Sequence, residues 1–213
     1  TSDLQPLHEF PAHSPVRKNT SVQIKWRGDG GSYIITTVDS DVVEERKIRV
    51  YDREGVLKSV CRSVDGTLCA KMHPEISWST DGSLITAVQT IRDKLQVIFF
   101  EPNGLRHRDF KLRNVTPKSH HVKAIDWNSD SNLLAIVLNS SSITSPSSNS
   151  LLQIYHRNNY HWYLKFELKS LTYDPIITAS FDAERPYRLT VNSNKLTASV
   201  YDFCWDINVN GDG

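Results

Sequence analysis

The sequence predicts an all-β protein built as a β-propeller, because it repeats one strand–turn–strand unit and is rich in strand-forming residues. The unit is a short apolar strand ending in an aromatic residue, a polar turn and a second apolar strand, and it occurs four times. No stretch keeps a helical period of apolar residues over about twelve positions, whereas strand-length apolar runs such as Leu95–Phe100 recur. Four strands about every 50 residues, with an aromatic marker and a turn, are typical of propeller blades, which stack around an axis and share their cores.

An aromatic residue closes the first strand of each unit. The markers follow one another at intervals of 52, 49 and 54 residues and are Trp26, Trp78, Trp127 and Phe181. We expect the three tryptophans to pack between neighbouring blades, because each blade has a face of large apolar side chains that it cannot bury alone. A β-sandwich, the competing all-β fold, predicts no repeat with this fixed order of markers.

A tight turn follows each marker. The turns are centred on Asp29 and Gly30, on Asp81 and Gly82, and on Asp130 and Ser131, and the fourth unit diverges from this pattern. The aspartate side chain can form a hydrogen bond with a backbone N–H of its own turn, and glycine adopts a positive φ without a steric penalty. A second tight turn joins the third strand of a unit to its fourth, and there we expect Gly55 and Gly104 to adopt a positive φ.

The third strands of the units set the blade boundaries. They are predicted at Lys47–Tyr51, Leu95–Phe100, Leu151–Tyr155 and Leu196–Phe203. The blades are then expected over residues 21–62, 74–113, 121–169 and 175–207, with residues 1–20 as the tail of a preceding blade and a connector, and 208–213 as a tail. A serine-rich loop over 139–150 interrupts the third blade. We expect it to be mobile, because contacts of its mostly small polar side chains would not offset the conformational entropy lost on ordering.

About four four-stranded antiparallel blades are expected to form part of a larger ring. Propellers run from about four to eight blades, and Met72 is the only methionine, so Thr1 is not expected to be a native start. The rest of the ring would then cover the open edges of these blades. The number of blades in the complete ring stays open at this point.

Composition excludes several classes of function. Its 25 Lys and Arg against 24 Asp and Glu give a formal charge of +1, which argues against a nucleic-acid footprint over the whole chain. No apolar run reaches the roughly 18 to 20 residues of a membrane helix. The three cysteines cannot all pair, and a chain of this length does not need them to, so we expect reduced thiols and a cytoplasmic location, with a nuclear one as an alternative.

No motif in the sequence predicts catalysis. The eight histidines and three cysteines do not fall at metal-ligand spacing, and neither a nucleophile elbow nor a phosphate-binding glycine loop occurs. We therefore expect no catalytic residue, no cofactor site, no metal site and no enzyme. An extracellular enzyme or adhesion propeller remains the weakest alternative.

One local stretch of the chain is strongly basic. Between residues 106 and 123 six cations face the single acid Asp109, and the cations are Arg106, Arg108, Lys111, Arg113, Lys118 and Lys123. On an outer strand, alternate side chains would form a basic rim. Two interpretations stay open: a charged edge strand that resists aggregation, or a surface that attracts RNA phosphate or an acidic partner.

Four longer strings make the prediction more specific. They read WRGDG at 26–30, IRVYDREG at 48–55, FFEPNGLRH at 99–107 and NYHWYLK at 159–165. In this order they resemble the largest subunit of the Elongator complex, the IKAP family. The resemblance covers most of residues 20–207 and places the chain in the later part of the first of that family's two WD-repeat propellers, with the serine-rich loop and the fourth repeat departing from the pattern.

The resemblance implies a non-catalytic scaffold. In that family a separate radical-SAM and acetyltransferase subunit modifies the wobble uridines of tRNA and holds the iron–sulfur cluster and acetyl-CoA. The partners implied are therefore the other Elongator subunits, with only an indirect relation to tRNA and none to a membrane. A protein-interaction propeller of another multi-subunit assembly is the alternative. Within the fourth string, Trp162 is expected either to cover a blade edge or to contact another subunit.

Overall fold

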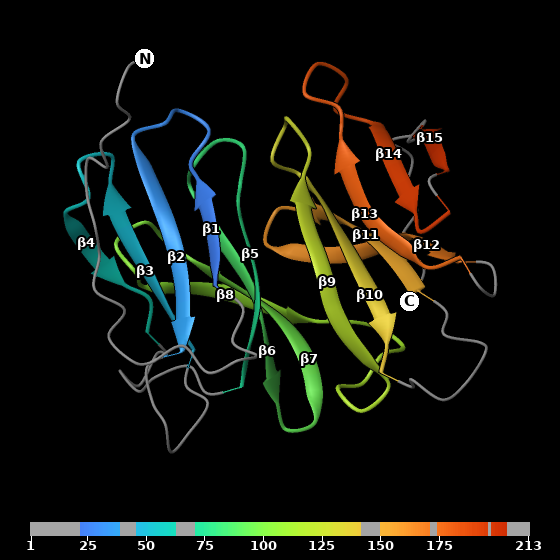
Figure 1. The fold of residues 1–213 in the computed structure, drawn as a ribbon, viewed down its shortest axis with the longest axis horizontal. Coiled ribbons are helices and arrows are strands. Elements are labelled where there is room, and N and C mark those ends of the chain that lie inside the picture. The colour runs from blue at the N-terminus through green and yellow to red at the C-terminus, as the bar shows by residue number, and fades with distance from the viewer. Residues whose placement is uncertain are drawn as a thin grey trace, which may run out of the picture.

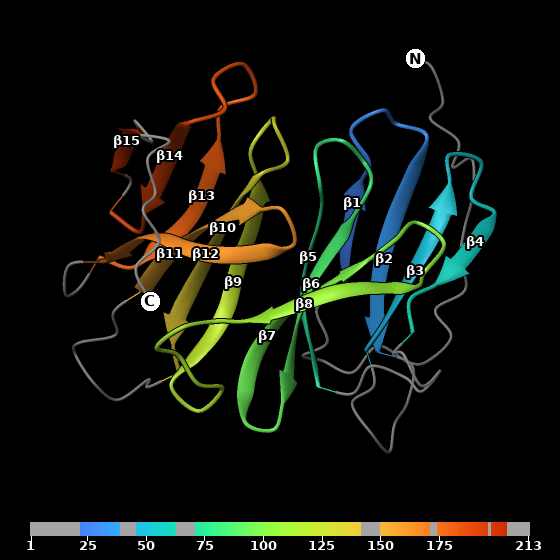
Figure 2. The same cartoon turned by 180° about the vertical axis from the view of Figure 1, so that it is seen from behind.

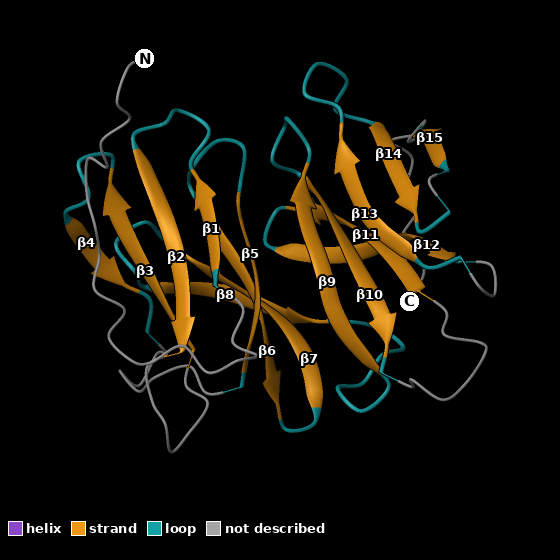
Figure 3. Cartoon of the chain, in the orientation of Figure 1, coloured by secondary structure: helices purple, strands orange, loops and turns teal. Residues whose placement is uncertain are grey.

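The computed structural model confirms an all-β chain of antiparallel sheets (Figures 1 and 3). The structure describes residues 22–38, 46–62, 71–141, 150–170, 174–195 and 197–203. The predicted tails at 1–20 and 208–213, and the middle of the serine-rich loop at 142–149, lie outside the described residues. No described residue is helical, and so no helix long and apolar enough to cross a membrane occurs among the described residues.

Four sheets, which we call blades 1 to 4, follow one another in chain order. Blade 1 contains β1 (Gln23–Trp26), β2 (Ser32–Val38), β3 (Arg46–Asp52) and β4 (Leu57–Val60). Blade 2 contains β5 (Met72–Trp78), β6 (Ile85–Ile91), β7 (Lys94–Phe100) and β8 (Arg106–Lys111). Blade 3 contains β9 (His120–Trp127), β10 (Leu133–Ser140), β11 (Ser150–Asn158) and β12 (His161–Lys169). Blade 4 contains β13 (Ile176–Phe181), β14 (Arg188–Ser193) and β15 (Ala198–Asp202).

Each blade is a simple meander in which consecutive strands pair. The first strands β1, β5, β9 and β13 adjoin one another in succession, so they form the inner side of the arc, and β4, β8 and β12 are outermost in their sheets. Figure 2 shows the molecule from behind, with β8 and β12 on the near side. Among the described residues the divergent fourth blade has three strands instead of four.

The hydrophobic core lies between the blades. Strand β7 shows why its sequence is largely apolar: Leu95, Val97 and Phe99 pack toward blade 3, whereas Ile98 and Phe100 pack toward blade 1. A strand buried on both faces needs apolar side chains throughout, unlike a strand with one solvated face. A third cluster joins blades 3 and 4 in the same way.

The marker aromatics pack on the blade that precedes them in the chain. Trp78 is 6% exposed, lies in the core between blades 1 and 2, and donates from Nε1 to the carbonyl of Lys25 at 3.2 Å. Trp127 is 5% exposed in the next core, and Phe181 packs against the third.

Trp26 does not follow this pattern, and the expectation that it packs between blades is wrong. It is 55% exposed, and its ring contacts Tyr33 of its own blade with centroids 4.7 Å apart. The physical reason is its place in the series. A marker packs on the preceding blade, and the described residues contain no sheet before blade 1.

The backbone of the turns matches the prediction. Gly55 and Gly104 have φ of 85° and 86°, and Gly30 and Gly82 have φ of 68° and 70°. In the third unit Ser131 takes the corresponding conformation with φ of 54°. Gly104 is the most constrained, because a Cβ there would lie 2.6 Å from the carbonyl oxygen of Val60. The turn between β7 and β8 therefore lies directly against blade 1.

Candidate partner-binding site

The basic stretch begins on β8, the outermost strand of blade 2. Its side chains alternate in exposure only weakly: Arg106 and Phe110 are half-buried, and the other four are exposed. Phe110 packs against the core between blades 2 and 3. The structure does not gather the predicted contact residues into one rim, and instead gives each a different surrounding.

Arg108 is the basic residue with the most specific contact. Its guanidinium lies over the ring of Tyr160 at 4.3 Å from the centroid. Tyr160 belongs to the turn between β11 and β12 and is 67% exposed. The pair is a cation–π contact that spans the junction of blades 2 and 3.

A cleft of about 380 Å³ lies at this junction. It is lined by Leu84, Phe99, His107, Arg108, Arg157, Asn159, Tyr160 and Trp162. Its side chains therefore come from the turn after β5, from β7 and β8, and from the β11–β12 hairpin. Among the described residues that line it, two are arginines and none is a carboxylate.

The floor of the cleft is part of the core. Phe99 is 1% exposed, and Trp162 stacks on it with centroids 5.2 Å apart and on Phe110 at 5.4 Å. Trp162 also meets Trp127 edge-on at 5.5 Å. Trp162 therefore covers the edge of blade 2, which is one of the two roles expected for it. The rest of its surface forms a wall of the cleft.

The other predicted contact residues lie outside the cleft. Arg106 is drawn to Asp109, with its Nη2 2.5 Å from Oδ2, and its side chain is only 12% exposed. Lys111 is exposed at the end of β8. The backbone of Arg113 is used internally, because its N–H donates to the Tyr155 hydroxyl at 3.0 Å and its carbonyl accepts from Gln153 at 2.8 Å.

The rim around the cleft contains acids that compensate part of its charge. Glu101 lies 3.4 Å from Nδ1 of His107. Burial acts to raise the pKa of Asp81, yet hydrogen bonds from Ser79 and Ser83 and the positive charge of Arg157 leave it below its usual value. The cations that line the cleft are therefore Arg108 and Arg157, and Asp81 offsets part of the charge of Arg157.

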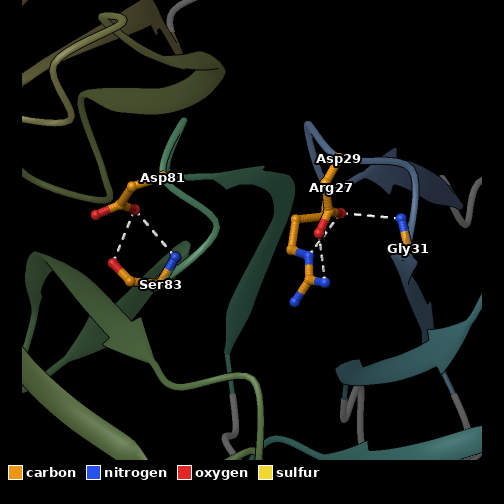
Figure 4. A network of polar contacts seen from close by, with 5 residues as sticks. All are labelled: Arg27, Asp29, Gly31, Asp81 and Ser83. Carbon is orange, nitrogen blue, oxygen red and sulfur yellow. Dashed lines mark hydrogen bonds and ion pairs between the residues drawn. The ribbon is translucent and has the colours of Figure 1, made fainter.

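The Asp–Gly turns lie at the same edge of the blades as the cleft and stabilise themselves. Asp29 accepts from the Gly31 N–H at 2.9 Å and from Nε and Nη2 of Arg27 at 2.8 and 2.6 Å (Figure 4). Hydrogen bonding to Arg27 is the main cause of the lowered pKa of Asp29. Asp81 accepts from the N–H and hydroxyl of Ser83 at 3.0 and 2.8 Å. These bonds explain the turn residues without invoking a ligand.

Neighbouring turns are also bonded to each other. The Thr80 hydroxyl donates to the Asn128 carbonyl at 2.8 Å, and the Asp81 N–H donates to the Ser131 hydroxyl at 2.9 Å. Asn128 in turn donates to the carbonyl of Pro186 at 3.2 Å. In the third turn the side chain that accepts hydrogen bonds from the turn backbone is Asn128 rather than Asp130. Its Oδ1 accepts from the N–H groups of Asn132 and Leu133.

Comparison with known proteins identifies the family. Residues 12–184 match the family model described as the ELP1 first N-terminal beta-propeller. The chain belongs to the Elongator complex protein 1 family. It is 39% identical to Elongator complex protein 1 of Mus musculus over 79% of this chain, and 36% identical to that of Saccharomyces cerevisiae over 69%. It is also 37% identical to a putative elongator complex protein 1 of Xenopus laevis over 95% of this chain. The chain spans 16% of the length of the Xenopus relative and 12% of the mouse one.

Solved structures support the fold of this member of the Elongator complex protein 1 family. The Cps50 (Swd1) β-propeller domain of Myceliophteria thermophila matches with a TM-score of 0.60 at 14% identity, covering 88% of this chain and 52% of that one. The WD40 domain of SCAP from fission yeast matches with a TM-score of 0.52 at 14% identity, covering 91% and 42%. At this identity the likeness concerns the fold alone.

Sequence reasoning missed part of the cleft. Arg157 and Leu84 carry no local signal, because the cleft arises only when the β11–β12 hairpin of one blade meets β8 of another. The single available signal was Tyr160 in the NYHWYLK string, an aromatic residue in a turn. Among the described residues no group of three or more His, Cys, Asp or Glu side chains could hold a metal ion.

Proposed function

We propose that this chain is a non-catalytic scaffold propeller of an Elongator complex, and that it supports the modification of tRNA wobble uridines by a separate catalytic subunit. Membership in the Elongator complex protein 1 family carries the proposal, since the family match covers residues 12–184. The relatives are named as proteins of that complex, and a scaffold role for this chain follows from the likeness.

The architecture supports a role in assembly. Three interblade cores and the bonded turns hold the blades in one arrangement, so surface side chains keep fixed relative positions. A rigid surface binds partners at a lower entropic cost than a flexible one. The proposed partners are the other Elongator subunits, including the radical-SAM and acetyltransferase subunit, together with the rest of the propeller. The proposed location is the cytoplasm, with a nuclear pool.

Deleting residues 22–203 from the protein in its own cells tests this function. The wobble-uridine modification of bulk tRNA, measured by mass spectrometry of nucleosides, is expected to fall, and recovery of the catalytic subunit in a pull-down through another subunit should fall with it. The matched control is the undeleted protein expressed from the same locus. Unchanged modification together with unchanged recovery would refute the scaffold function, and fractionation of the same cells tests the location.

A further inference from the structure

We propose that the cleft between blades 2 and 3 binds an acidic segment of a partner protein, with a carboxylate at Arg108 and Arg157 and an apolar side chain on the aromatic floor. The proposal rests on the scaffold function above, because it names the chemistry of one of the scaffold's partners. Four steps carry it: the size of the cleft, its floor, its two guanidinium groups and the charge of its surroundings.

The size favours a segment rather than a folded domain. A volume of about 380 Å³ falls at the lower end of ligand sites, and it accommodates a few side chains. The mouth opens beside the β11–β12 turn, where Tyr160 stands 67% exposed. An extended peptide can lie across this mouth and insert one side chain.

The floor is apolar and rigid. Leu84 is 7% exposed and Phe99 is 1% exposed, and both belong to the same core cluster, against which Trp162 is packed. Aromatic surface that is already held by stacking loses little side-chain entropy when it is covered. Such a floor contributes apolar contact to an inserted leucine, phenylalanine or methionine side chain.

The two arginines provide the specificity. The guanidinium carbon of Arg108 lies over the ring of Tyr160 at 4.3 Å from its centroid, and the N–H donors of a guanidinium stand at the edge of its plane. This edge is the part of arginine that matches a carboxylate with two parallel hydrogen bonds. Arg157 lies on the facing hairpin of the same cleft, and none of the described lining residues is an acid. The acid near Arg157 is Asp81, which lies outside the lining and accepts hydrogen bonds from the hydroxyls of Ser79 and Ser83.

The surrounding charge favours a short acidic peptide over RNA. Arg106 is held by Asp109, and Glu101 lies beside His107. The exposed cations Lys111, Arg113, Lys118 and Lys123 are not among the residues that line the cleft, so the cleft itself offers two arginines. A peptide with one or two carboxylates matches two arginines.

Photo-crosslinking in cells tests the proposal with the intact protein. The photoreactive amino acid p-benzoylphenylalanine replaces Tyr160, the assembly is purified after irradiation, and the crosslinked segment is sequenced by mass spectrometry. We expect a protein segment with at least one aspartate or glutamate close to the crosslinked position. A crosslink to RNA, a crosslink to a segment without acids, or no crosslink at all would overturn the proposal.

Charge variants make the readout specific. Arg108→Glu and Arg157→Gln, each combined with the crosslinker, should lower the crosslink yield about tenfold or more, the change expected for losing a charge-assisted hydrogen bond. Arg92→Glu is the matched control, because Arg92 is exposed in the β6–β7 turn at the opposite end of blade 2. Equal yields in the cleft variants and in the control would also overturn the proposal.

Two outcomes separate this inference from the scaffold function. Loss of wobble-uridine modification on deletion, together with no acidic crosslink at Tyr160, rejects the cleft proposal alone. An acidic crosslink that depends on Arg108, in a protein whose deletion leaves modification and assembly unchanged, rejects the scaffold function alone. Recovery of the other subunits with each point variant confirms that the propeller is folded.

Discussion

The marker tryptophans should differ in their contribution to stability although they occupy the same place in the repeat. Trp127 is 5% exposed, packs with Phe99 and Trp162, and donates from Nε1 to the Thr86 hydroxyl at 2.9 Å. Trp127→Ala removes this packing and leaves a buried hydroxyl without its donor, so the free energy of unfolding should fall by about 3 to 5 kcal/mol. Trp26 is 55% exposed, and its main ring contact is with Tyr33. Trp26→Ala should therefore lower the same quantity by only about 1 kcal/mol, the value of one exposed aromatic pair.

Urea denaturation followed by circular dichroism measures this difference, since tryptophan fluorescence would change with the mutation itself. With a slope of about 2 to 3 kcal/mol per molar urea, Trp127→Ala should move the midpoint down by roughly 1 to 2.5 M and Trp26→Ala by about 0.5 M or less. Trp78→Ala is the internal check and should behave like Trp127→Ala, because Trp78 is 6% exposed in the preceding core. Equal losses for all three variants in this 213-residue chain would refute the view that each marker packs on the blade before it.

Three further predictions follow from the same structure. Gly104→Ala should lower the free energy of unfolding by more than about 2 kcal/mol, because a Cβ would lie 2.6 Å from the Val60 carbonyl oxygen. Gly30 has a similar φ but open space where a Cβ would be, so Gly30→Ala should lower it by only about 1 kcal/mol in the same denaturation assay. Burial raises the pKa of Tyr155 to about 12, so the free energy of unfolding of the wild type should decline as the pH rises from about 10 to 12. Tyr155→Phe should lack this alkaline decline and should lose about 1 to 3 kcal/mol at pH 7, because the Tyr155 hydroxyl is hydrogen-bonded. An unchanged decline in the variant would contradict the raised pKa of Tyr155. Burial raises the pKa of Glu75, whose Oε2 has no hydrogen-bond partner among the described residues. The free energy of unfolding of the wild type should therefore fall as the pH rises through that pKa. Urea denaturation should show Glu75→Gln to be more stable than the wild type at pH 7 but not at pH 4.

The repeat could be read from the sequence because its causes are local. Asp81 and Gly82 determine their turn through hydrogen bonds to residues no more than three positions away. The largely apolar run Leu95–Phe100 indicates a strand that is buried on both faces. These patterns persist in each unit even where single residues change, as where Ser131 adopts the backbone conformation of a glycine.

The environment of a repeated residue could not be read in this way. Trp26 and Trp127 share the same position in the repeat, and their burial differs because it depends on a neighbouring blade rather than on the surrounding sequence. The same reason limits the prediction of the site. Arg106 and Arg108 are the same residue type two positions apart, but Arg106 pairs with Asp109 whereas Arg108 contacts Tyr160 in a turn of the next blade.

The position of the cleft links binding to the stability of the blades. Phe99 and Trp162 are at once its floor and part of the contact between blades 2 and 3, and Trp162 stacks on two aromatic rings of blade 2. A segment seated on this floor would contact both blades, and it would bind only where the two blades are packed together. A ligand that binds the packed state alone stabilises it by about 2.7 kcal/mol at a concentration of 100 times its Kd. Because this amount is comparable to the loss expected for a buried aromatic residue, a partner in the cleft could offset a weakened core at this junction, and it would leave the junction of blades 1 and 2 unchanged.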